Sequence, residues 1–122
     1  MDADRFRAWV EGYVRAWASN DPEEIGSLFA DDAEYRTAPD AQPRVGRDAI
    51  VGGWLEDRDE PGEATFTFDV VGVDGGRGFV QGVTSYRAND EHPARTYDNL
   101  WVVDLDDDGR ARSFTEWFMR RR

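Results

Sequence analysis

Apolar residues recur at helical spacing near the start of the chain and at every second position in its later half. In the first stretch, charged residues stand mostly opposite the apolar side chains, which are Phe6, Trp9, Val10, Tyr13, Val14 and Trp17. This spacing predicts an amphipathic helix over residues 4–18. The stripe is expected to face the core, where the hydroxyl of Tyr13 needs a hydrogen-bond partner such as a backbone group, a water molecule or a ligand oxygen.

A second, shorter helix is predicted directly afterwards. Asp21 can cap this helix with its carboxylate, and Pro22 suits the first helical position because its missing N–H would be unpaired there. Ile25, Leu28 and Phe29 then share one helical face. The period changes from helical to extended after these residues, which ends the helix and begins a strand.

The remaining elements follow from alternation and turn residues. A strand over residues 33–38 places Tyr35 and Thr37 on one side, since side chains alternate along a strand. A third helix opens at residues 46–48, carries Trp54 and ends before residues 59–62. Further strands are predicted over residues 64–70, 79–86, 95–105 and 110–119. Helices followed by a long antiparallel sheet predict a single α+β domain over residues 1–122, in which three helices cover a curved sheet.

Composition narrows the possible partners. The chain carries 15 basic and 26 acidic residues, a net charge of −11, which argues against nucleic acid and anionic lipid as partners. With no Cys and one His, we expect no disulfide, no metal site and no cofactor. The charged start of the chain and the absence of a long apolar run favour a cytoplasmic protein.

Several runs of sequence resemble a known superfamily. They are Asn20-Asp21-Pro22, Leu28 to Ala33, Pro43 to Ile50 and Phe114 to Phe118, and they resemble the nuclear-transport-factor-2-like superfamily, most closely its SnoaL-like and ketosteroid-isomerase-like branch. The resemblance implies a cone-shaped α+β barrel with a ligand cavity inside its sheet. This fold hosts isomerases, cyclases, epoxide hydrolases, dehydratases and binding modules, so the function has to be argued from the site.

The resemblance also implies which residues line the cone. The inward set is Tyr13, Trp17, Tyr35, Thr37, Trp54, Val83, Ser85, Asn99, Trp101, Trp117 and Met119. Tyr13 falls where the isomerases keep a tyrosine that donates a hydrogen bond to the substrate oxyanion. Thr37 falls where they keep a catalytic aspartate, and a hydroxyl cannot accept a proton near neutral pH. Val83, Ser85 and Met119 likewise stand where the epoxide hydrolases keep charged catalytic residues.

Three functions follow from this set. The first is binding of a small hydrophobic or aromatic molecule, with catalysis left open. The second is an isomerase, cyclase or lyase for a steroid-like or polyketide-like substrate, with Tyr13 as oxyanion donor and Glu116 or Asp98 as base. Both carboxylates lie on the predicted outer face, but a bulge or a one-residue register slip would bring either one inside. An open pocket with a buried carboxylate would favour this second function.

The third function is a structural or partner-binding dimer with a filled cavity. The outer sheet face is predicted to carry an apolar patch, which would be exposed in a monomer and consists of Leu100, Val102, Phe114 and Phe118. We therefore expect a homodimer formed through this face.

Overall fold

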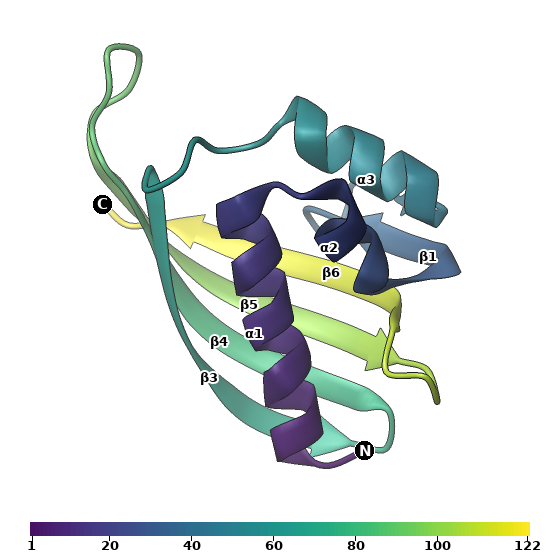
Figure 1. The fold of residues 1–122 in the computed structure, drawn as a ribbon. Coiled ribbons are helices and arrows are strands. Elements are labelled where there is room, and N and C mark those ends of the chain that lie inside the picture. The colour runs from purple at the N-terminus through teal and green to yellow at the C-terminus, as the bar shows by residue number, and fades with distance from the viewer.

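The computed structural model describes all residues from 1 to 122 and shows three helices on one side of a curved sheet (Figure 1). The helices are α1 (Ala3–Ser19), α2 (Pro22–Ser27) and α3 (Arg47–Glu56). The strands are β1 (Phe29–Arg36), β2 (Arg44–Val45), β3 (Ala64–Asp74), β4 (Arg77–Tyr86), β5 (Arg95–Leu105) and β6 (Ala111–Arg120). None of the helices combines the length and the apolar character needed to span a lipid bilayer.

The six strands lie in the order β2-β1-β6-β5-β4-β3. β1 pairs with β6 in parallel, and every other neighbouring pair is antiparallel. The predicted α+β architecture, with three helices on a mainly antiparallel sheet, is confirmed. The sheet does not close on itself, because β2 and β3 are free edges.

α1 lies across the concave face of the sheet (Figure 1). Its N-terminus is capped by Asp2, whose side chain accepts a hydrogen bond from the backbone N–H of Arg5 at 2.8 Å. The predicted apolar stripe is buried, with Phe6 and Val10 fully enclosed. Phe6 packs directly onto β4 at Gly78, where a Cβ atom would come within 2.4 Å of the phenyl ring. Gly78 therefore sets how closely this helix approaches the sheet.

α2 begins as the sequence predicts but ends earlier. Asp21 accepts a hydrogen bond from the backbone N–H of Glu23 at 2.9 Å, and Pro22 takes the first helical position. α2 ends at Ser27, so the prediction that Phe29 lies on the helix is wrong: Phe29 is the first residue of β1. Its fully buried ring packs edge-on against Trp9 and Tyr35, and this packing favours the extended backbone.

Two β-bulges change which side chains face the helices. In the β3–β4 ladder the register shifts between Val70 and Gly72, leaving Val71 without a partner. In the β5–β6 ladder it shifts next to Leu105, leaving Arg112 without a partner. Because a one-residue shift moves every following side chain to the opposite face, these two residues determine which side chains of β3 and β6 lie on the concave surface.

Candidate functional site

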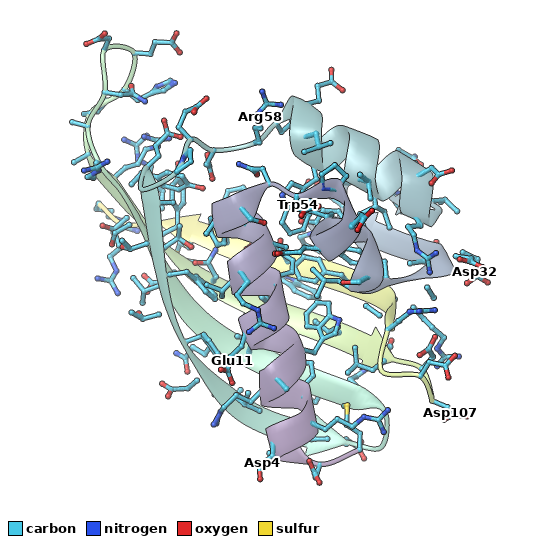
Figure 2. The ribbon with its side chains drawn as sticks, in the orientation of Figure 1. Asp4, Glu11, Asp32, Trp54, Arg58 and Asp107 are labelled. Carbon is cyan, nitrogen blue, oxygen red and sulfur yellow. The ribbon has the colours of Figure 1, made fainter.

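One pocket opens on the concave face, between the C-terminal half of α1, the end of α3 and the sheet. It has a volume of about 370 Å³. Its lining comes from 17 residues, which are Tyr13, Trp17, Tyr35, Thr37, Arg44, Trp54, Asp57, Arg58, Asp59, Thr84, Tyr86, Arg95, Tyr97, Asn99, Trp101, Glu116 and Phe118. Trp54 lies beneath α3 on the side of the sheet, whereas Arg58 projects from the chain just beyond that helix (Figure 2). The pocket thus has a buried aromatic interior and a charged rim.

The interior is built around Tyr13 on α1. Its ring centroid lies 4.5 Å from that of Trp101 and 4.8 Å from that of Trp54, and it stacks on Phe114 at 5.4 Å. All four side chains are at least nine-tenths buried. Such close aromatic contacts leave few alternative rotamers, so this wall of the pocket is preorganised.

Two tyrosine hydroxyls meet in this interior. The hydroxyl oxygens of Tyr13 and Tyr35 lie 2.7 Å apart, and either can donate to the other. One of the two protons is used in this bond, which leaves the other available to a ligand oxygen. Burial raises the pKa of both phenols well above their ordinary value, so both remain protonated donors at neutral pH.

Glu116 is the only carboxylate in the aromatic interior. Its Oε2 accepts hydrogen bonds from Trp101 Nε1 at 2.8 Å and from Asn99 Nδ2 at 2.9 Å. Its Oε1 accepts no hydrogen bond and is not fully buried, so this oxygen is open to a ligand. Burial raises the pKa of the carboxyl above its ordinary value, and the hydrogen bonds from Trp101 and Asn99 oppose this rise.

Asn99 is itself held in place by Thr84. The Thr84 hydroxyl donates to Asn99 Oδ1 at 2.8 Å, which turns the amide nitrogen toward Glu116. The partners on β4, β5 and β6 thus form a continuous chain of side-chain hydrogen bonds that ends at the carboxylate. Both Thr84 and Asn99 are more than nine-tenths buried, so the chain is shielded from exchange with solvent.

Asp59 ties the loop after α3 across one side of the rim. Its Oδ2 accepts from Trp17 Nε1 at 2.9 Å and from the Tyr86 hydroxyl at 3.4 Å, while its backbone oxygen accepts from Asn20 Nδ2 at 3.0 Å. Burial raises the pKa of this carboxyl, and the Trp17 hydrogen bond opposes the rise. Asp59 therefore joins the end of α1 to β4 next to the opening.

Three arginines complete the rim. Arg44 lies across α3 at Gly53, where any Cβ atom would come within 2.5 Å of its guanidinium, and its Nη2 contacts Asp57 Oδ2 at 2.7 Å. Arg95 places its guanidinium carbon 4.4 Å from the ring centroid of Tyr86, at cation–π distance. Arg58 donates to the backbone oxygen of Leu55 at 3.0 Å.

The structure separates the predicted site residues into two groups. Those that line the pocket are Tyr13, Trp17, Tyr35, Thr37, Trp54, Asn99 and Trp101. Val83, Ser85, Trp117 and Met119 do not line it, because they lie on the convex face. Their places are taken by neighbours one position away along the same strands, which are Thr84, Tyr86, Glu116 and Phe118.

The two candidate bases lie on opposite faces of the sheet. Glu116 was expected on the outer face but lies inside, because the bulge at Arg112 pairs it with the inward-facing Trp101. Asp98 is on the convex face, where its two oxygens accept from Arg121 at 2.8 and 2.9 Å and the ion pair holds its pKa below the ordinary value. Asp98 is therefore not a base for this pocket.

Sequence reasoning missed most of the rim. Arg44, Asp57, Arg58 and Asp59 come from β2 and the loop after α3, where neither period nor alternation assigns a direction. Arg95 is the first residue of β5 and shares the parity of Asn99 and Trp101, so alternation could have placed it. One usable signal was present on β4. Gly78, Val80 and Gly82 share parity with Thr84, and glycines facing a helix or a large ring mark the inward face of a strand.

Known proteins share this fold. An NTF-2-like protein of unknown function from Burkholderia xenovorans LB400 superposes with a TM-score of 0.73 at 15% identity, covering 98% of this chain and 86% of that one. A putative ketosteroid isomerase from Kribbella flavida DSM 17836 gives a TM-score of 0.73 at 17% identity, covering 98% of this chain and 81% of that one. Among curated proteins, no sequence matches.

The sequence itself carries the family signal. The profile of the SnoaL-like domain matches residues 10–114, a stretch that runs from α1 into β6 and includes Tyr13 and Tyr35. The resemblance predicted from the sequence is confirmed, and the protein belongs to the SnoaL-like domain family.

Proposed function

We propose that the protein is a general acid–base enzyme that binds a small, largely apolar molecule and uses Glu116 to move a proton on it. The observation that carries the proposal is an open pocket of about 370 Å³ with a single, largely buried carboxylate on its inner wall. This volume is typical of small-molecule sites. Isomerase, cyclase and lyase reactions on steroid-like or polyketide-like ketones all need such a proton transfer.

The geometry around Glu116 suits a base. Trp101 and Asn99 hold Oε2, so Oε1 is the oxygen that faces the substrate. A pKa raised by burial brings a carboxylate closer to neutral pH, where it exchanges protons with carbon acids more effectively. In the proposed step Oε1 takes a proton from the carbon next to a carbonyl. The C–H electron pair forms a carbon–carbon double bond, and the π pair of the carbonyl moves onto its oxygen.

The tyrosine pair supports the other end of this step. Tyr13 packs against Trp101, whose indole N–H contacts Glu116, so the hydroxyls and the carboxylate belong to one wall of the pocket. The unshared hydroxyl proton would stabilise the oxygen on which negative charge develops. Thr37, at the rim, is not needed as a base in this scheme.

The proposal is tested by incubating the protein with a Δ5-3-ketosteroid, an epoxide and a polyketide-like ester. We expect turnover of a ketone or ester substrate that falls a hundredfold or more in Glu116→Gln. Asp98→Asn is the matched control, because it also neutralises one carboxylate of the same two-strand ladder but on the convex face. Binding without turnover of any member of the panel would instead support a binding protein.

We further propose a homodimer formed through the convex face. The predicted patch needs correction, since Phe114 is buried in the core and Phe118 lines the pocket. Leu100 and Val102 remain on that face and are joined there by Trp117 and Met119, of which Met119 is 73% exposed. We expect sedimentation at micromolar concentration to give twice the chain mass of 13.9 kDa, and Trp117→Glu to give the single mass. From the charged start of the chain and its lack of a long apolar run, we also propose a cytoplasmic location.

A further inference from the structure

The rim of the pocket differs from the rest of the surface in its balance of charge. The chain as a whole has 26 acidic and 15 basic residues. The rim has three arginines, Arg44, Arg58 and Arg95, against two acids, Asp57 and Asp59. The rim of this pocket is thus less acidic than the strongly acidic chain as a whole.

Both rim acids are already engaged. Asp57 forms an ion pair with Arg44 at 2.7 Å, and Oδ2 of Asp59 is held by Trp17 and Tyr86. Arg58 and Arg95 take part in none of the ion pairs of the structure. Two guanidinium groups therefore remain at the rim without an acidic partner.

Arg95 is half-buried and held in a defined position. It lies over the ring of Tyr86, and its only hydrogen bond goes from Nη1 to the backbone oxygen of Pro93 at 3.4 Å. A guanidinium carries five N–H donors, so most of its donors are unused. A stacked arginine with free donors is well suited to bind a planar anion with two oxygens, because its orientation is fixed beforehand.

An aromatic surface continues inward from this arginine. Tyr86 contacts Tyr97 and Tyr97 contacts Phe118, each pair edge-on with ring centroids 5.9 Å apart. These three side chains line the pocket on β4, β5 and β6, and Phe118 is 55% exposed. A ring system that lies on this surface would have its outer end beside Arg95 and its inner end near Glu116.

We propose that the ligand is an amphipathic anion, an aromatic or polycyclic carboxylic acid whose carboxylate is bound by Arg95 with help from Arg58. This inference rests on the proposed function and names the substrate class for the same pocket. The carboxylate stays at the rim, where the guanidinium groups replace part of its hydration. The apolar body enters the pocket and brings the reacting carbon to the carboxylate of Glu116.

The test compares two probes of the same shape, 2-naphthoate and 2-naphthamide, by isothermal titration calorimetry on the intact protein. We expect the naphthoate to bind about fivefold to twentyfold more tightly at low salt, the range for a partly desolvated charge-assisted hydrogen bond. The preference should shrink as salt is added, because the rim is open to solvent.

Variants assign the effect to the rim. Arg95→Gln should remove most of the preference for naphthoate. Arg58→Gln, at an exposed position, should remove a smaller part and leave folding unchanged. Arg7→Gln is the matched control, since it deletes the same charge from an exposed position of α1 outside the pocket. Binding of naphthamide should be the same in all four proteins.

The failures are distinguishable. If naphthamide binds as tightly as naphthoate, or if Arg7→Gln lowers the preference as much as Arg95→Gln, the anion subsite is wrong while the pocket remains a ligand site. If neither probe binds, the proposal of an aromatic carboxylic acid as ligand is wrong, whereas the proposed function is overturned only if the ketosteroid and ester are not turned over.

Discussion

The two ends of the concave face share the same strands and the same helix but are built differently. At the end near the β5–β6 turn, the inward side chains Val80, Val103 and Ala111 are fully buried beneath the first half of α1. At the other end, the inward positions of the same strands carry Thr84, Asn99 and Glu116. Polar groups with matched partners thus keep a space open where apolar groups would close it. Along a single strand, the change from apolar to polar inward residues marks where the core ends and the site begins.

The largest effect is expected at the packed end. Phe29→Ala should lower the free energy of unfolding by about 3 to 5 kcal/mol, because it removes a fully buried ring that joins α1 to β1. Phe118→Ala, at the open end, should lower it by less than about 1 kcal/mol, since that ring is 55% exposed. Urea denaturation of both variants measures the difference. Equal losses would show that the two ends do not differ in packing.

A smaller effect of opposite sign is expected at Glu116. Glu116→Gln should raise the free energy of unfolding at pH 7 by about 0.5 to 2 kcal/mol, because a neutral amide replaces a carboxylate whose charged form is disfavoured by burial. The folded-state pKa of this carboxyl lies above its ordinary value of 4.5, so its contribution to stability is full below pH 4.5 and is lost as the pH rises through the folded-state pKa.

The gain should therefore disappear when the unfolding experiments are repeated below pH 4.5. Glu11→Gln, on the solvent side of α1 (Figure 2), is the control and should give no comparable gain. A loss of stability in Glu116→Gln at pH 7 would mean that the open end is held together by this carboxylate rather than strained by it.

The smallest effect concerns ligand binding at the tyrosine pair. Tyr13→Phe should weaken a ketone or phenol ligand by about 0.5 to 1.5 kcal/mol, the net worth of one hydrogen bond, and leave a hydrocarbon of the same shape almost unaffected. The Tyr13→Phe/Tyr35→Phe double variant removes the last hydroxyl proton and should abolish the preference for the ketone. Calorimetric titrations with the ketone and with the hydrocarbon measure this preference in each variant. A preference that survives in the double variant would assign the oxygen to another donor.

The fold and half of the site could be predicted from the sequence because they depend on short-range pattern. The stripe of α1 faces inward, which places Tyr13 and Trp17, and the alternation of β5 correctly separates Asn99 and Trp101 from Asp98. These assignments need only the repeat of apolar residues along one helix or strand, and one face of that element that is clearly more apolar than the other. They do not depend on how one strand is aligned with the next.

The other half of the site depends on the two β-bulges, which the spacing of apolar residues along the chain does not reveal. Continued without a shift from Leu105 opposite Ala111, β6 would place Trp117 opposite Asn99, and both would face inward as expected from the sequence. The extra residue Arg112 places Phe118 there instead. On β3, the extra residue Val71 places Thr84 rather than Ser85 opposite Phe66. Both faces of β6 carry aromatic residues, so hydrophobicity alone could not correct the error.

The parallel pairing of β1 with β6 has a consequence for how the chain acquires its structure. Phe29 lies beside Ala111 and Tyr35 beside Phe114, so β1 finds its main neighbour only in β6, after all the other strands of the sheet have been synthesised. Contacts so distant in sequence slow folding, because a long loop must close before they form. During translation β1 lacks its neighbour, and Trp9 and Tyr13 on α1 lack their contact with Phe114, until β6 leaves the ribosome. Since β6 also carries Glu116, a nascent chain truncated before this strand should be prone to aggregation and should lack the proposed base.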